Sequence, residues 1–132
     1  MHKVHRIGTL LVLLAPGLMA GCDGRRIPLV SSSQHVQLAD ATAERARQRF
    51  IDYGCVACHT IPGVKAPVTV VGPPLENLAL RGYIGGVLPN TPDNLVKWLQ
   101  DPPAVDPRTA MPDMGVSSQD AKAMAAYLLR LD

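Results

Sequence analysis

The sequence predicts a small all-α domain of three to four helices, and three observations support this prediction. No segment sustains the alternation of apolar and polar residues that is typical of a half-buried strand, whereas three segments repeat apolar residues at helical spacing. Twelve prolines and eleven glycines indicate that long loops join the helices. Aromatic residues make up only 4% of the 132 residues, so the core lacks bulk that a large buried cofactor would supply.

Residues 1–21 have the layout of a secretory signal. A basic start is followed by an apolar run at residues 7–14, which is too short to span a bilayer. The segment ends in L-M-A-G-C at residues 18–22, which resembles the lipobox of bacterial lipoproteins, although Met19 stands where those proteins usually have leucine. We therefore expect cleavage before Cys22 and lipid attachment to it, with a plain secreted protein as the alternative.

Residues 22–39 are expected to form a flexible, lipid-anchored tether, because they show neither periodicity nor an apolar cluster. Residues 40–132 then form the folded domain, on the periplasmic side of the bacterial inner membrane. Removing Lys3 and Arg6 with the signal reduces the 13 Lys and Arg residues to 11, which face 11 Asp and Glu residues. This neutral chain has no basic patch, so nucleic acid is not an expected partner.

The two other cysteines, Cys55 and Cys58, lie in the sequence G-C-V-A-C-H-T, and three chemistries use such a pair. A structural zinc site needs two further Cys or His ligands, and the only other histidine after the signal is His35, in the expected tether. A thioredoxin-like dithiol needs a strand before it and a helix after it. Here a helical segment comes first and a loop rich in Pro and Gly follows, so both interpretations are poorly supported.

The C-x-x-C-H spacing suits the covalent attachment of one haem. Each thiol adds across one vinyl group of the porphyrin, and the two residues between the cysteines set the distance between the sulfur atoms. His59 directly follows the second cysteine and is thereby placed beneath the iron as an axial ligand. The export signal agrees with this interpretation, since bacteria attach such haems outside the cytoplasm.

An electron-carrying haem needs a second axial ligand, and methionine is a common one. Met111 lies in T-A-M-P-D-M-G at residues 109–115, and prolines on both sides stiffen this loop around a weak thioether ligand. We expect Met111 to bind the iron and Met114 to be a core side chain, with Met114 or His35 as the alternative ligand. No catalytic constellation is evident, so the predicted activity is electron transfer rather than catalysis.

These segments together resemble a class I, monohaem cytochrome c, from about Ala41 to the end of the chain. The matching segments are CVACH at 55–59, VGPPL at 71–75, LVKWLQDP at 95–102, TAMPDMG at 109–115 and DAKAMAAYLLRL at 120–131. The resemblance implies the small cytochrome c fold, with helices wrapped round one covalently bound haem c. It also implies that the Pro73 carbonyl accepts the ring N–H of His59, which fixes the imidazole and raises its basicity.

Each expected helix has a recognisable start. The first helix is expected from Ala41 to Tyr53 with Asp40 as its N-cap. The third begins at Thr91-Pro92, an N-cap followed by proline at the first helical position. The last follows Ser117, which has the form of a capping box with Asp120 three positions on.

The inner faces of the first and last helices define the expected core. They offer Ala43, Ala46, Phe50 and Tyr53 from the first helix and Ala121, Met124, Ala125, Leu128 and Leu131 from the last. The resemblance implies that these helices cross closely, with Phe50 and Tyr127 as the aromatic contact. Trp98, the only tryptophan, is expected to form a wall of the haem pocket, with a surface electron relay as the alternative.

Residues 86–112, GVLPNTPDNLVKWLQDPPAVDPRTAMP, are similar to the cytochrome c domains fused to subunit II of bacterial haem–copper oxidases. The difference is that no copper-site domain precedes the haem domain in this sequence. This similarity implies electron transfer in a respiratory chain, from a quinol-side donor complex to a terminal oxidase. A subunit of a periplasmic dehydrogenase and a haem-based sensor are the alternatives, and the sensor depends on an open iron position in place of Met111.

Overall fold

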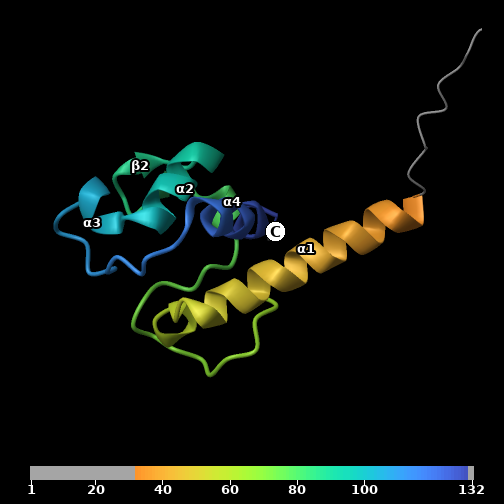
Figure 1. Ribbon diagram of the computed structural model, residues 1–132. Coiled ribbons are helices and arrows are strands. Elements are labelled where there is room, and N and C mark those ends of the chain that lie inside the picture. Colours follow the sequence, from red (N-terminus) through yellow and green to blue (C-terminus); the bar gives the residue numbers. More distant parts are fainter. Residues whose placement is uncertain (1–31, 131–132) are drawn as a thin grey trace, which may run out of the picture.

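A computed structural model of the chain describes residues 32–130, which form an all-α fold with one short hairpin (Figure 1). The helices in this range are α1 (Ser32–Asp52), α2 (Pro92–Gln100), α3 (Pro102–Val105) and α4 (Ser118–Leu128), with two 3₁₀ turns at Cys55–Ala57 and Leu78–Leu80. The predicted fold class is thus confirmed. Between residues 32 and 130, no helix is both long and apolar enough to cross a membrane.

Helix α1 is longer than predicted, because it begins at Ser32 and not at Ala41. Residues 32–39 are thus helical, and Asp40 lies inside the helix rather than at its expected N-cap. That residues 22–39 act as a tether stays a prediction. From Ser32 to Asp52 the sequence contains no Gly or Pro, so nothing interrupts a helix whose composition favours it. The signal, Cys22, the first part of the expected tether and Leu131 lie outside the described residues.

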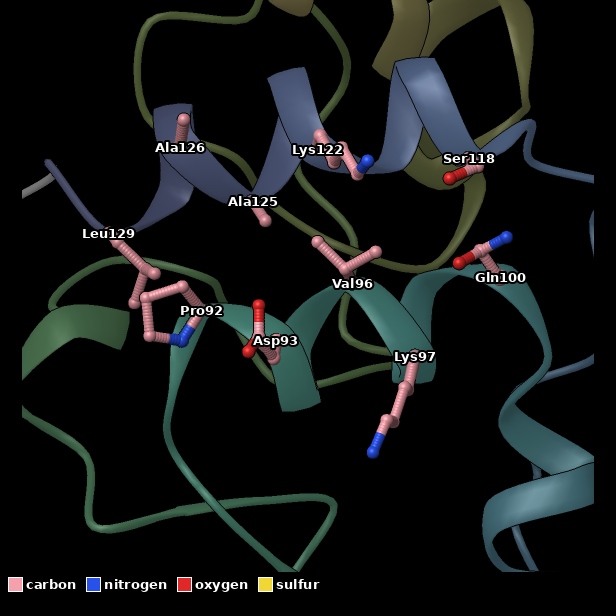
Figure 2. A pocket seen from close by; sticks show the side chains of 10 residues that line it. All are labelled: Pro92, Asp93, Val96, Lys97, Gln100, Ser118, Lys122, Ala125, Ala126 and Leu129. Carbon is pink, nitrogen blue, oxygen red and sulfur yellow. The ribbon is translucent and has the colours of Figure 1, made fainter.

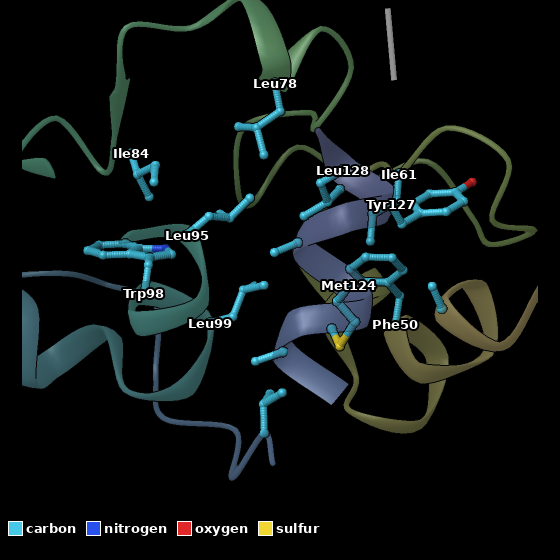
Figure 3. Packing of buried hydrophobic residues seen from close by; sticks show 14 residues of the cluster. Phe50, Ile61, Leu78, Ile84, Leu95, Trp98, Leu99, Met124, Tyr127 and Leu128 are labelled. Atoms are coloured by element: carbon cyan, nitrogen blue, oxygen red, sulfur yellow. The ribbon is translucent and has the colours of Figure 1, made fainter. Parts of the chain in front are cut away.

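Helices α1 and α4 pack against each other through their predicted inner faces (Figure 3). Phe50 and Met124 are completely buried, and Ala46 is 1% exposed, so the small alanine allows a close approach of the helices. The rings of Phe50 and Tyr127 lie 5.7 Å apart at 56°, a tilted arrangement that aromatic pairs favour. The predicted aromatic contact is confirmed.

A polar cluster joins the end of α1 to the start of α4. The Ser117 hydroxyl accepts a hydrogen bond from the Asp120 backbone N–H at 3.1 Å, which confirms the predicted N-cap. The Asp120 carboxylate accepts hydrogen bonds from the Tyr53 hydroxyl at 2.8 Å and the Ser117 hydroxyl at 3.0 Å, and pairs with Arg49 at 3.1 Å. These contacts, led by the Tyr53 hydrogen bond, lower the pKa of Asp120.

Helix α2 begins as predicted and carries the tryptophan into the interior. Thr91 caps it by accepting the Asn94 backbone N–H at 3.3 Å, and Pro92 is its first residue. Leu95, Trp98 and Leu99 are buried on the face of α2 that meets the core (Figure 3). This helix packs against α4, so α4 lies between α1 and α2.

A two-stranded antiparallel hairpin precedes α2 and was not predicted. Strand β1 (Tyr83–Ile84) pairs with β2 (Leu88–Pro89), and two residues are too few to show alternation in the sequence. Gly85 and Gly86 turn the chain with φ of 56° and 77°, values that favour glycine. At Gly85 a Cβ would lie 2.5 Å from the Trp98 ring, so a glycine is needed there for the indole to fit.

A groove of about 750 Å³ runs between α2 and α4 on the surface (Figure 2). Val96 on α2 and Ala125 and Lys122 on α4 are among the residues that line it. None of the residues that the sequence predicts to bind a cofactor lines this groove. It therefore belongs to the surface of the helical scaffold and not to the candidate site described next.

Candidate functional site

The end of α1 positions the two cysteines and the histidine. Gly54 adopts φ of 71° and its N–H donates to the Ile51 carbonyl at 2.9 Å, which ends the helix with a residue that tolerates this conformation. The chain then tightens into the 3₁₀ turn Cys55–Ala57. The backbone N–H groups of Cys58 and His59 both donate to the Cys55 carbonyl, at 3.2 and 3.0 Å. The structure thus brings all three predicted side chains into one turn.

The imidazole of His59 is held by a single strong contact. Its Nδ1 lies 2.7 Å from the Pro73 carbonyl oxygen. A carbonyl oxygen can only accept, so Nδ1 donates the proton, and in the neutral imidazole Nε2 is then the nitrogen with the free lone pair. This is the hydrogen bond that the resemblance implies for Pro73, and in the neutral ring it leaves Nε2 available to bind a metal.

The loop that carries Pro73 is fastened to the cysteine turn at several points. Gly72 N–H donates to the Cys58 carbonyl at 2.7 Å, and Leu75 N–H donates to the Thr60 carbonyl at 2.9 Å. The Thr69 hydroxyl donates to the Ala57 carbonyl at 3.2 Å. Together these bonds fix the position of the Pro73 carbonyl relative to the His59 ring.

Gly72 is a site residue that sequence reasoning missed. A Cβ on this residue would lie 2.6 Å from Cε1 of His59, closer than real Cβ contacts allow, and 3.0 Å from the Cys58 carbonyl oxygen, tighter than most of them. Only glycine therefore allows the loop backbone to lie against the edge of the imidazole. The signal was present in the sequence, because Gly72 directly precedes the expected acceptor Pro73.

The Cys55 thiol lacks a feature that the thiols of dithiol oxidoreductases have. Cys55 and Cys58 are both free and partly buried. Burial raises the pKa of the Cys55 thiol, with the neighbouring Cys58 as a smaller contribution in the same direction. Dithiol oxidoreductases need the opposite, a lowered pKa that makes the thiolate available at neutral pH.

The methionine loop places its two methionines differently from each other. Met111 is partly buried and packs against the core cluster, and its N–H donates to the Thr109 hydroxyl at 3.1 Å. Met114 is 38% exposed, so the expectation that it is a core side chain is wrong. A turn in which Gly115 N–H donates to the Asp113 carboxylate at 2.8 Å keeps this end of the loop at the surface. Which methionine binds an iron stays a prediction.

Trp98 lies in the interior and not on the surface. Its side chain is 8% exposed and lies close to Ile84 of β1 and Leu95 of its own helix (Figure 3). Burial of this kind is what a pocket wall requires and what a surface relay would lack. That the indole borders a haem stays a prediction.

The donor set in this region fits a haem of c type. It offers two free thiols in one turn, an imidazole nitrogen with a free lone pair, and thioether side chains on a separate loop. Such a set matches covalent attachment through two sulfur atoms and axial ligation by nitrogen and sulfur. It is poor in the carboxylates and additional thiolates that other metals prefer.

Comparison with known proteins agrees with the geometry. The family model for cytochrome c matches residues 43–132. The chain belongs to the cytochrome c family. Haem c binding is the property of this family, and the all-α fold with its C-x-x-C-H turn is the expected scaffold for it.

Two curated relatives define the branch of the family. The chain is 32% identical over 101 residues to cytochrome c oxidase subunit 2 of Alkalihalophilus pseudofirmus, which covers 76% of this chain and 29% of the relative. It is 32% identical over 98 residues to cytochrome c oxidase subunit 2 of Bacillus sp. strain PS3, covering 71% and 27%. The chain thus spans less than a third of the length of these relatives. The predicted resemblance to the cytochrome c domain of subunit II is confirmed.

Proposed function

We propose that this chain carries one covalently bound haem c and delivers electrons to a terminal oxidase in a bacterial respiratory chain. The observation that carries the proposal is the hydrogen bond from His59 Nδ1–H to the Pro73 carbonyl. It orients a histidine that directly follows the turn of Cys55 and Cys58. The similarity to oxidase subunit 2 supports the terminal oxidase as the acceptor. A quinol-side complex is the proposed donor.

The chain's own residues have distinct tasks in this function. The thiols of Cys55 and Cys58 would hold the haem covalently, each by adding its S–H across one vinyl C=C, an addition that needs no oxidant. His59 Nε2 and the Met111 sulfur would bind the iron, and Pro73 would keep the imidazole in place and basic. The haem, when bound, would supply a one-electron iron couple. With two iron ligands from the protein, the chain would act as an electron carrier rather than an enzyme.

Two methionine variants test this proposal. Met111→Ala should abolish the weak far-red absorption of a thioether bound to ferric low-spin haem, lower the reduction potential and let small ligands bind. Met114→Ala, three residues on in the same loop, is the matched control and should keep the band. The reverse pattern would assign the ligand to Met114. Haem that acidified solvent extracts from the denatured wild-type protein would overturn the covalent attachment.

The proposed location is the periplasmic side of the inner membrane, with Cys22 carrying the lipid. The support is the sequence L-M-A-G-C, which resembles the lipoprotein processing site. Cys22→Ser should release the protein from membranes or block its processing, as measured by fractionation and by the mass of the mature N-terminus. A variant that remains membrane-bound and correctly cleaved would exclude this anchor.

A further inference from the structure

Asn90, at the entrance to α2, ties two separate points of an upstream loop together. Its side-chain Nδ2 donates to the carbonyls of Leu78 at 2.7 Å and Arg81 at 2.9 Å. Its backbone N–H donates to the Gly82 carbonyl at 3.0 Å. The start of α2 thereby fixes the whole turn from residue 78 to residue 82.

The Asn90 side-chain amide uses its nitrogen for two hydrogen bonds, while its oxygen makes none within the part of the chain that the structure describes. Its Oδ1 is buried and has no hydrogen-bond partner among the described residues. An unpaired buried acceptor is unfavourable, so the two donated bonds must offset it. The position of the side chain is therefore set by the two N–H donors of Nδ2, which bond to the carbonyls of Leu78 and Arg81.

Arg81, which Asn90 fixes, reaches back to the loop of the candidate site. Its Nη2 donates to the carbonyls of Pro74 at 2.5 Å and Glu76 at 3.0 Å. These carbonyls directly follow Pro73, the acceptor for His59. Both bonds come from one nitrogen at the tip of the guanidinium, a position that the shorter lysine side chain does not reach.

We propose that Asn90 and Arg81 are positioning residues that set the hydrogen bond between Pro73 and His59, and through it the reduction potential of the bound haem. The contacts form a continuous series from the start of α2, through Asn90, Arg81 and the 74–76 backbone, to the imidazole. A strong Nδ1–H···O bond makes the imidazole a more basic ligand, which stabilises ferric iron. This inference rests on the proposed haem ligation by His59.

The principal test uses a variant that changes no charge. In Asn90→Ala, the His59 ring N–H should exchange with deuterium about tenfold faster in the ferrous protein, because its acceptor is less firmly placed. The reduction potential should rise as the imidazole becomes less basic. NMR measures the exchange rate and redox titration measures the potential, both on the full-length haem-loaded protein.

Asn94→Ala is the matched control. The Asn94 side chain also donates to a backbone carbonyl, that of Pro89 at 3.0 Å, in the same part of the fold. The hydrogen bonds that Asn94 donates go to Thr91 and Pro89 and not to the 74–82 segment, so both readouts should keep their wild-type values. A change in Asn94→Ala as large as that in Asn90→Ala would show a general loosening of the fold and overturn the inference.

Arg81→Lys provides the second variant and decides the matter if Asn90→Ala does not fold. It keeps the positive charge, but its side chain is one bond shorter, so the ammonium falls short of the position from which Nη2 donates to the Pro74 and Glu76 carbonyls. The expected result is again faster exchange and a higher potential. Wild-type exchange and potential in the folded variants, with haem attached and the far-red band intact, would overturn the inference and leave the proposed function standing. Failure of haem attachment in the wild-type protein would instead refute the proposed function.

Discussion

The α1–α4 interface and the loop from residue 62 to residue 77 are stabilised by different interactions. The interface buries Phe50 and Met124 completely. The loop contains no buried side chain, and hydrogen bonds to its backbone hold it, as at Gly72 and Pro73. Apolar packing is strong but non-directional, whereas these hydrogen bonds are directional. The interface therefore determines whether the domain folds, and the loop determines how the histidine is oriented.

The loop is not short of apolar residues. Val68, Val70 and Val71 are 84%, 94% and 75% exposed, although each is as apolar as many core residues. Apolar composition alone therefore does not create a core. The apolar residues must also lie on a helix or strand that packs against another helix or strand. The prolines and the glycine between Ala66 and Leu75 prevent such an element from forming.

The largest expected effect lies in the interface. Phe50→Ala should lower the free energy of unfolding by about 3–5 kcal/mol, because it removes a fully buried ring and leaves a cavity. Urea denaturation measures this loss. Ile51→Ala is the neighbouring control, 42% exposed, and should cost clearly less. Equal losses in the two variants would contradict the assignment of stability to the interface.

An intermediate effect is expected in the loop. Gly72→Ala should cost about 1–3 kcal/mol, because the added methyl group collides with the His59 ring and forces the loop outward. It should also weaken the far-red band by displacing the axial histidine. Gly82→Ala is the control, since a Cβ there meets nothing within 4 Å. If Gly72→Ala is as stable and spectrally normal as Gly82→Ala, the loop does not orient the imidazole.

The smallest effect concerns pH. Because the pKa of Asp120 is lowered in the folded state, its contribution to stability is present above the unfolded value, about 3.9, and is lost as the pH falls through the folded pKa. The difference in unfolding free energy between the wild-type protein and Asp120→Asn should thus be constant near neutral pH and shrink below about pH 4. Urea denaturation at a series of pH values measures this difference, and a difference that stays constant at acidic pH would contradict the prediction.

Sequence signals predicted the parts of the fold that depend on neighbouring residues. Thr91 with Pro92, and Ser117 with Asp120, are helix starts whose geometry is decided within one turn. The C-x-x-C-H turn is equally local. The His59 contact with Pro73 is not local, and it was expected only because a family resemblance supplied it.

The remaining features depend on residues far apart in the chain or on the absence of a signal. Helix α1 starts at Ser32 because nothing stops it, and a missing breaker is harder to recognise than a present one. Gly72 is required by the position of a ring that precedes it in sequence, and Asn90 bonds to carbonyls of residues 78 and 81. Every residue has a backbone carbonyl, so the sequence does not indicate which distant carbonyl a side-chain donor will hydrogen-bond.

The length of α1 has a consequence for encounters at a membrane. Residues 32–40 span about 13 Å as a helix, against about 30 Å for the same stretch fully extended. With the proposed anchor at Cys22, this shortening reduces the distance that the domain can reach from its anchor, and so the volume in which it can meet a partner. Effective concentration rises as the reach of a linker falls, until the linker can no longer span the sites. The helix would thus favour an electron acceptor close by in the same membrane and disfavour a distant one.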